Sequence, residues 1–551
     1  MISLVVNSRL HLCQSSSSRI FVPLISCFES KIAAPSLIFH LPYLLPSSVS
    51  RNPFVCHSYE NCRGVPTIPI LELPATHTSK GQKFGRIVAI DRDFAASLPG
   101  FVGVMDEEEH FLCHGDAGHV DDQRQCFACA GRRAERWPGA AALTVIRAGT
   151  LIDGVSETPK KNQVIFVRGE RIEKVTDGSA AIPAGTKVID LSNATVLPGL
   201  IDAHTHIFLW GEDPAKGGYD ANILNAGIAL RAARATVAAR RALEQGFTTI
   251  RDVETEGAGY GDIEIKQAIE EGTIPGPRIF GATRAISTTG GYNLEGYAPE
   301  LEMPKGAQIV DGPVEARKAA RQQLEHGADW IKVYMTHRSW VDKQGNLVSQ
   351  PTLTVEELQA IVDEAHGWQK KVACHAYNGI GLQRALEGGC DSIEHGLEIT
   401  DAQIAQMKRQ GTWYCPTLSP YYGDWAPADT PGGKRDRARA AVHEISFKKA
   451  LQAHLKIVYG TDIGGIPWTE PIAQEFKRMV SLGMTPMDAI QSATSRSAEM
   501  LDMKGEIGVI AAGAYAEVIA VEGDPLKHIE ELEHVRFVMH DGSIFKNEIA
   551  K

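Results

Sequence analysis

Short apolar runs recur along the middle of the chain, each directly after a glycine that ends a helical stretch. The clearest junctions are Gly246 before residues 247–250, Gly327 before residues 330–334, and Gly389 before residues 392–395. A helix that ends at glycine and leads into a strand, repeated at this spacing, indicates parallel β/α units. About eight such strands lie between Val196 and Asp462, which favours a closed (β/α)8 barrel over an open sheet. The predicted fold class is therefore α/β, with a TIM-like barrel over residues 198–505.

Two helix starts within this region are marked by their capping residues. Thr354 and Glu357 form a capping box ahead of a stretch with apolar residues at helical spacing. Thr485 followed by Pro486 has the form of an N-cap with proline at the first helical position. Both patterns predict helices between the strands of the barrel.

The two ends of this region have a different pattern, with short β-prone runs separated by glycine, aspartate and proline. They lie at residues 144–146, 164–167, 171–175 and 188–189 on one side, and at residues 517–521 and 535–539 on the other. These runs predict a small β-sandwich built from residues 141–197 and 506–551.

The leader, residues 1–60, is rich in serine and apolar residues and carries Glu29 as its only acid before Glu60. An organelle transit peptide has this composition, and a disordered leader or a mis-assigned start would have it equally. Residues 61–140 show no sustained periodicity and are interpreted as an irregular linker. The expected location is that of a soluble enzyme in the cytoplasm, or in an organelle if the leader is a transit peptide.

Composition restricts the classes of partner. The 551 residues are 43% hydrophobic and 22% charged, and the formal net charge is -11. Such a chain offers no basic stripe for nucleic acid, and none of its apolar runs reaches the roughly 20 residues of a membrane helix. Small molecules and further copies of the chain in a homo-oligomer are the remaining candidate partners.

Cysteines are concentrated near the start of the chain. Seven precede residue 130, and only three follow, which favours a reducing compartment. Within the early group, one set could hold a zinc ion, although its flanks predict no hairpin or helix to orient the ligands: Cys113, His114, His119, Cys126 and Cys129.

Candidate metal ligands stand where the predicted barrel strands end. His204 and His206 follow the apolar run 196–201, and alternation along a strand sends both rings to one side. His375, His395 and Asp462 each end a later predicted strand. The carboxyl ends of the strands form the catalytic rim of a (β/α)8 barrel, so these side chains predict a metal site there.

Lys332 lies inside the apolar strand 330–334, where a charged ammonium group would be costly to bury. Desolvation lowers the pKa of such a lysine and exposes a neutral, nucleophilic amine. The amine can take up carbon dioxide to become a carbamate, an anionic ligand able to bridge two cations. The alternative is a lysine whose ammonium group reaches the rim and stays in water.

These motifs resemble the amidohydrolase superfamily over about residues 143–546. Pro-Gly-Leu-Ile-Asp-Ala-His-Thr-His at residues 198–206, Ala-Asp-Trp-Ile-Lys-Val-Tyr at 328–334 and Ser-Ile-Glu-His-Gly at 392–396 are similar to the imidazolonepropionase-related branch. That branch includes Xaa-Pro dipeptidases and ochratoxin-hydrolysing amidases. The resemblance implies a metal-dependent amidohydrolase that cleaves a dipeptide or an N-acyl amino acid.

The resemblance also implies roles for the candidate residues. One divalent ion, expected to be Zn²⁺, would be bound by His204, His206 and Asp462, and a second by His375 and His395. Carboxylated Lys332 and a hydroxide would bridge the two ions. The hydroxide would attack the amide carbonyl, Asp462 would pass its proton to the leaving amine, and Tyr334 would hydrogen-bond the oxyanion.

One position departs from the branch, because Tyr292 stands where a substrate-holding histidine is expected. Arg284, His337 and Arg338 are nearby candidates for binding a substrate carboxylate. Three alternatives share the fold: a deaminase with a single metal ion, a hydrolase of cyclic amides or lactones, and a scaffold without catalysis. About two bound metal ions per chain would favour the binuclear hydrolase, one the deaminase and none the scaffold.

Overall fold

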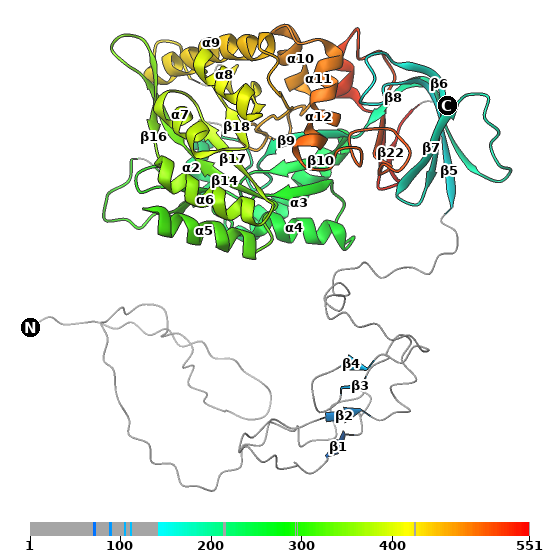
Figure 1. Cartoon of the computed structure of the whole chain (residues 1–551), viewed down its shortest axis with the longest axis horizontal. Helices are drawn as coiled ribbons and strands as arrows, with labels where there is room; N and C mark the ends of the chain where they lie inside the picture. Colours follow the sequence, from blue (N-terminus) through cyan, green and yellow to red (C-terminus); the bar gives the residue numbers. More distant parts are fainter. Residues whose placement is uncertain are drawn as a thin grey trace, which may run out of the picture. The chain divides into compact units, whose positions relative to one another are not determined.

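The computed structural model describes residues 70–72, 88–90, 104–105, 111–112, 142–212, 216–292, 294, 296–423 and 426–549 (Figure 1). The chain divides into two compact units, residues 1–132 and 133–551. In the first unit, β1 (Ile70–Glu72) pairs antiparallel with β2 (Val88–Ile90), and β3 (Val104–Met105) with β4 (Phe111–Leu112). The predicted linker 61–140 thus contains short paired strands. The leader 1–60 and the cysteine and histidine set 113–129 lie outside the described residues.

One seven-stranded sheet collects strands from both ends of the second unit, in the order β22-β21-β20-β8-β5-β6-β7. Its strands are β5 (Leu143–Leu151), β6 (Lys160–Arg168), β7 (Arg171–Asp177), β8 (Lys187–Pro198), β20 (Val518–Val521), β21 (Phe537–His540) and β22 (Ser543–Asn547). All neighbours pair antiparallel except β5 and β8, which are parallel. The predicted union of the two chain ends is therefore observed, as strands of one sheet.

Parallel strands make up two further sheets between these ends. The first has the order β11-β10-β9, with β9 (Leu200–Thr205), β10 (Phe247–Asp252) and β11 (Arg278–Gly281). The second has the order β13-β12-β14-β17-β18-β19, with β12 (Ile286–Ser287), β13 (Gln308–Ile309), β14 (Trp330–Tyr334), β17 (Lys371–Ala376), β18 (Ser392–His395) and β19 (Trp413–Cys415). Together with the helices they form a mixed α/β structure.

Residues 456–463 link these two sheets without forming a regular strand. Parallel bridges join Tyr414 of β19 to Ile457 and Thr205 of β9 to Ile463. The backbone N–H of Ala203 donates to the carbonyl of Tyr459 at 2.9 Å. The expected strand that ends at Asp462 is thus an irregular segment, although it occupies the place of a strand between β19 and β9.

Helices connect and cover the parallel strands (Figure 1). They are α2 (Gly218–Leu224), α3 (Ile228–Glu244), α4 (Gly261–Glu270), α5 (Pro313–Glu325), α6 (Val355–Gly367), α7 (Gly379–Gly388), α8 (Asp401–Gln410), α9 (Pro431–Gln452), α10 (Gln474–Ser481), α11 (Pro486–Ser492) and α12 (Ser495–Met500). A hairpin of β15 (Thr336–Val341) and β16 (Leu347–Pro351) follows β14. Two 3-10 turns, Ser419–Tyr421 and Ile529–His534, complete the described elements.

The predicted junctions of helix, glycine and strand are confirmed. Gly246, Gly327 and Gly389 have φ angles of 89°, 91° and 93°, a left-handed conformation that residues with a Cβ rarely adopt. The capping box at Thr354 is complete, and the side chain of Thr485 accepts a hydrogen bond from the backbone N–H of Asp488. Each chain reversal is therefore encoded by its own local residues.

Cys374 of β17 and Cys390, which follows α7, form a disulfide with their Cα atoms 6.1 Å apart. The expectation of a reducing compartment rested on sparse cysteines, but this fold brings two of them within bonding geometry. Among the described cysteines, Cys415 is free and buried. In the described part of the chain, no helix is both long enough and apolar enough to span a bilayer.

Candidate active site

A cavity of about 530 Å³ opens where β9, β14, β17 and β18 end. All six predicted metal ligands and Tyr334 line it: His204, His206, Lys332, Tyr334, His375, His395 and Asp462. The parallel register aligns the strand ends, since His375 pairs with Glu394 and Ala376 with His395. Residues far apart in the sequence thereby face one space.

His204, His206 and Asp462 form the first group of potential ligands. The Oδ1 atom of Asp462 lies 3.1 Å from Nε2 of His206 and 3.6 Å from Nε2 of His204. Their ligand atoms all lie within 4.8 Å of one another. The backbone N–H of Asp462 donates to the carbonyl of His204 at 2.8 Å, which fixes the irregular segment against β9. Two imidazoles and a carboxylate at this spacing can bind one divalent ion.

His375 and His395 form a second group beside the first. Their ring centroids are 4.4 Å apart, and those of His204 and His395 are 4.9 Å apart. Burial disfavours the charged ring and holds the pKa values of His204, His375 and His395 well below the usual range, and Lys332 lowers them further. Neutral imidazole is the form that binds metal ions.

Lys332 lines the same cavity as both groups and is 1% exposed. Desolvation lowers the pKa of its ammonium group, and the nearby Glu394, Glu254 and Asp462 only partly oppose that effect. Its Nζ atom lies 5.5 Å from the ring centroid of Tyr334. The expectation that the amine is buried, and does not reach out to water, agrees with this position.

Buried partners hold the other ring nitrogens of these histidines. Nδ1 of His204 lies 2.7 Å from Oε2 of Glu394, and Nδ1 of His395 lies 2.7 Å from the hydroxyl of Thr417. By contrast, Nε2 of His204 and Nε2 of His375 are buried without a hydrogen-bond partner. Such nitrogens are costly to bury unless something binds them, so the donor set fits a metal centre.

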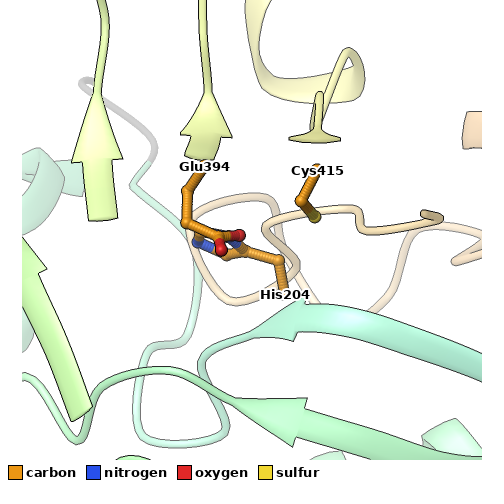
Figure 2. Close-up of side chains that lie close together, drawn as sticks. All are labelled: His204, Glu394 and Cys415. Atoms are coloured by element: carbon orange, nitrogen blue, oxygen red, sulfur yellow. The ribbon is translucent and has the colours of Figure 1, made fainter. Parts of the chain in front are cut away.

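Figure 2 shows His204, Glu394 and Cys415, which come from β9, β18 and β19. The Oε1 atom of Glu394 accepts a hydrogen bond from Arg251 at 2.8 Å, and both side chains are fully buried. The Glu394 carboxylate therefore bridges a buried cation and the His204 ring. We assign this cluster to orienting His204, because its polar atoms are already engaged with one another.

Two site residues have left-handed backbone conformations. The φ angle is 71° at His395 and 59° at Asp462. Non-glycine residues adopt this region at a cost, and such strain gathers at functional sites. In these conformations both side chains line the cavity.

Acids after β10 were not predicted from the sequence. Glu254 accepts a hydrogen bond from Tyr334 at 2.5 Å, and Glu256 accepts one from Tyr292 at 2.5 Å and one from Tyr219 at 2.7 Å. Both acids are nearly inaccessible to solvent. Two acids with one intervening residue, shortly after a parallel strand, are the sequence signal that could have indicated them.

Cationic side chains line another part of the cavity. Of the predicted carboxylate-binding candidates, His337 and Arg338 line it, whereas Arg284 is not among its lining residues in the described chain. Arg435 and Arg439 of α9 also line it and were not predicted. They lie far along the chain from the candidate ligand His375 of β17, and no local pattern links the two elements.

The model of the Amidohydrolase family matches residues 195–545, a stretch that contains all six candidate ligands of the cavity. The chain belongs to the amidohydrolase family. Ochratoxinase of Aspergillus niger is 30% identical to this amidohydrolase over 439 residues, which cover 74% of this chain and 87% of that protein. The resemblance noted in the sequence is confirmed, and this amidohydrolase is a hydrolase of carbon–nitrogen bonds.

Other relatives extend the comparison. A solved Xaa-Pro dipeptidase with bound methionine is 33% identical to this amidohydrolase, with a TM-score of 0.67, and the match covers 74% of this chain and 100% of that chain. A prolidase complexed with N-methylphosphonate-L-proline is 29% identical, with a TM-score of 0.64 and coverage of 74% and 100%. The imidazolonepropionase of Nocardia farcinica is 27% identical over 64% of this chain and 83% of that protein.

Proposed function

We propose that this amidohydrolase uses two divalent metal ions, Zn²⁺ in the first instance, to cleave the amide bond of a dipeptide or an N-acyl amino acid. The observation that carries the proposal is the pair of buried, unpartnered Nε2 atoms of His204 and His375, which lie beside the buried amine of Lys332. Buried neutral nitrogens without partners are expected where metal ions complete the site.

The chain's own residues divide into two ligand sets around Lys332. His204, His206 and Asp462 would hold one ion, and His375 and His395 the other. The neutral Lys332 amine would add to carbon dioxide, forming a nitrogen–carbon bond and releasing one proton, and the resulting carbamate would bridge the two sets. When bound, the ions would supply Lewis-acid polarisation of the substrate carbonyl and activation of a water molecule.

Proton transfer is assigned to Asp462. Its Oδ1 atom is close to both histidines of the first set and faces the cavity, so it can take a proton at that oxygen and give it to the leaving amine. Tyr334 also lines the cavity. Its hydroxyl, which donates to Glu254 in this structure, would turn to the carbonyl oxygen as negative charge develops there.

We also propose the finer architecture that this function requires. The bridges of residues 456–463 to β19 and to β9 support closure of the parallel strands into a (β/α)8 barrel. Apolar side chains of β5, β6 and β8 share one core with those of β20 and β21, which supports a small β-sandwich at the chain ends. The barrel would then present the ligands at its carboxyl rim.

The substrate class rests on the relatives. The solved Xaa-Pro dipeptidase holds methionine, and the solved prolidase holds N-methylphosphonate-L-proline, both of amino-acid type. The relation to ochratoxinase points to an amide bond as well. The relation to imidazolonepropionase supports cyclic amides as the alternative substrate class.

Two measurements test the proposal on the purified full chain. Metal content by plasma mass spectrometry is expected to be about two ions per chain, whereas one ion would favour a deaminase and none a scaffold. A panel of Xaa-Pro and other dipeptides, N-acyl amino acids, lactones and cyclic imides is then assayed. Turnover of the first two classes supports the proposal, and turnover restricted to lactones or cyclic imides overturns it.

A further inference from the structure

The cavity lining carries charges of both signs. Glu256 lines it and accepts a hydrogen bond from Tyr292, and Glu254 is buried against Tyr334. Helix α9 (Pro431–Gln452) contributes Arg435 and Arg439 to the lining. A bound substrate with a free carboxylate would be repelled by the acids and attracted by the arginines.

Hydrogen bonds also keep the tyrosine hydroxyls around Glu256 from binding a substrate carboxylate. Tyr292, which stands where the family branch is expected to have a substrate-holding histidine, donates its hydroxyl to Glu256 at 2.5 Å. The Tyr219 hydroxyl lies 2.7 Å from that of Tyr292 and also donates to Glu256. Because both hydroxyl groups are engaged with an acid, the group that binds a substrate carboxylate must lie elsewhere.

Arg439 has the geometry of a fixed carboxylate receptor. Its Nε atom donates to the hydroxyl of Ser339 at 2.8 Å. Its guanidinium carbon lies 5.2 Å from the ring centroid of Tyr377 and 6.0 Å from that of Tyr421. Ser339, Tyr377 and Tyr421 are all buried, so the residues that hold the guanidinium are themselves packed. A guanidinium held in this way loses little entropy when it binds a ligand.

The two terminal nitrogens of Arg439 remain available. Within the described part of the chain, Ser339 is the only residue to which this guanidinium donates a hydrogen bond, and it does so through Nε. Nη1 and Nη2 form the planar fork that matches the two oxygens of a carboxylate. Arg435, one helical turn earlier, lines the same cavity, but its Nε and Nη2 atoms lie 3.2 Å from Asp436. The Asp436 carboxylate offsets that positive charge.

Arg439 also lies close to the ligand sets. The Tyr377 ring, over which it sits, is 4.4 Å from the ring of His375 and 5.5 Å from that of His395. In a peptide, the α-carboxylate of the leaving amino acid lies one residue, about 3.5 Å, beyond the scissile carbonyl carbon. The Tyr377 side chain lies between the Arg439 guanidinium and the rings of His375 and His395. The guanidinium can therefore reach the carboxylate of a substrate whose carbonyl lies beside those rings.

We propose that Arg439, held by Ser339 and stacked beside Tyr377, binds the free α-carboxylate of the amino acid that leaves on hydrolysis, and so restricts the enzyme to substrates with that group. This inference rests on the proposed function and specifies its substrate. It makes Arg439 a determinant of specificity, because it recognises a part of the substrate that undergoes no bond change.

The test pairs the best substrate of the dipeptide and N-acyl amino acid panel with its C-terminal carboxamide, which lacks the charge. The wild-type enzyme is expected to show a kcat/KM about 10- to 100-fold lower on the carboxamide. The variant Arg439→Gln is expected to lose about 10- to 100-fold on the acid and less than about threefold on the carboxamide. Arg439→Lys keeps the charge without the planar fork and is expected to fall between Arg439→Gln and the wild type.

Arg437→Gln is the matched control, because Arg437 lies on the same helix, is exposed and does not line the cavity. Its kcat/KM on both compounds is expected to equal that of the wild type. Equal losses by Arg439→Gln on acid and carboxamide would overturn the inference by showing a structural role, as would no loss on the acid. If Arg439→Gln fails to fold, Arg439→Lys carries the test of the residue, and equal cleavage of acid and carboxamide by the wild type still overturns the inference.

The two levels of proposal fail in different ways. If the wild type cleaves the acid and the carboxamide equally well, the inference about Arg439 is wrong while the amide hydrolase function stands. If the wild type cleaves no linear amide of the panel, the proposed function itself is wrong, and the inference falls with it.

Discussion

Lys332 is buried in the lining of the cavity that the four histidines share, and burial lowers the pKa of its ammonium group. The variant Lys332→Met keeps the apolar stem and removes the amine, so it cannot form the carbamate that we propose as a bridge. We expect fewer than two bound metal ions per chain and a kcat/KM lower by at least about 100-fold, the upper end of what loss of an outer-shell partner causes. Plasma mass spectrometry and an assay on the best amide substrate measure both effects.

The bicarbonate response separates a carbamate from an ordinary lysine at this position. Metal-free wild-type enzyme reloaded in buffer without carbon dioxide should regain activity faster when bicarbonate is added, and Lys332→Met should show no such response. Lys371→Met is the control, because Lys371 starts the neighbouring strand and bonds to Asp502 and to the Met500 carbonyl. Full metal content and full activity in Lys332→Met would exclude the carbamate.

Thr417 orients His395 through a single hydrogen bond to Nδ1. Thr417→Val preserves the shape of the side chain and removes that bond, so the ring loses its fixed orientation. The expected result is a metal affinity weaker by about 10- to 100-fold, measured by competition with a chelator. Thr417→Ser keeps the hydroxyl and should bind metal within about threefold of the wild type. Equal metal affinity of the two variants would show that His395 is held by packing alone.

The candidate ligands that share the cavity could be found from the sequence, because each follows an apolar run that is typical of a strand. His204, His375 and His395 belong to or end regular strands. The side-chain directions of Glu256 and Arg439 could not be predicted in the same way. Glu256 itself has a left-handed backbone conformation, and the direction of Arg439 depends on how the long helix α9 packs. Neither direction is contained in a local periodicity.

At the scale of elements, glycine positions predicted the alternation of helix and strand well. Gly246, Gly327 and Gly389 each require a left-handed conformation, which gives a sharp local signal for the end of a helix. Residues 456–463 show the opposite case. They read as a strand by composition, but their pairing is reduced to isolated bridges, because Asp462 turns into the cavity with a φ of 59°.

The turn after β5 is held by Asp153. Its carboxylate accepts hydrogen bonds from the backbone N–H groups of Val155 and Ser156, and from Lys160 at 2.7 Å. Burial alone would raise the pKa of Asp153, but the Lys160 and Ser156 hydrogen bonds outweigh it and lower the pKa to about 2. We expect Asp153→Asn to reduce the free energy of unfolding by about 1 kcal/mol at neutral pH, since Lys160 is half exposed and screened by water.

The sign of the pH dependence follows from that lowered pKa. An unfolded aspartate titrates near a pKa of about 3.9, so the folded state gains stability from the ionised Asp153 above that pH. The gain is lost as pH falls from about 5 toward 2. In urea titrations of the metal-free proteins, the difference between the wild type and Asp153→Asn should therefore shrink over this range. A difference that stays constant with pH would assign the effect to packing.

At the scale of the whole molecule, the two ends of the second unit are joined directly before β9, the first of the parallel strands that carry candidate ligands. Residues 195–198 of β8 pair with residues 518–521 of β20, and the N–H of Gly199 donates to the carbonyl of Glu517 at 2.9 Å. β9, which carries His204, starts at the next residue, Leu200. Similar β-prone runs at the two ends predicted that they share a structure, but not the strand order, because pairing between segments so distant in the sequence leaves no local signal.

A chain that stops at Gly513 lacks β20, β21 and β22, and it should fail to fold. Burial of Val518, Phe537 and Met539 contributes about 1.5–3 kcal/mol each, and a typical domain is stable by only about 5–15 kcal/mol. The truncation would also leave β8 as an exposed apolar edge, which promotes aggregation. We expect the truncated chain to appear in the insoluble fraction without bound metal, while a chain that stops at Ile549 should match the wild type in melting temperature and metal content. A soluble chain ending at Gly513 that still binds two ions would show that the parallel strands hold His204 in place without support from the C-terminal strands.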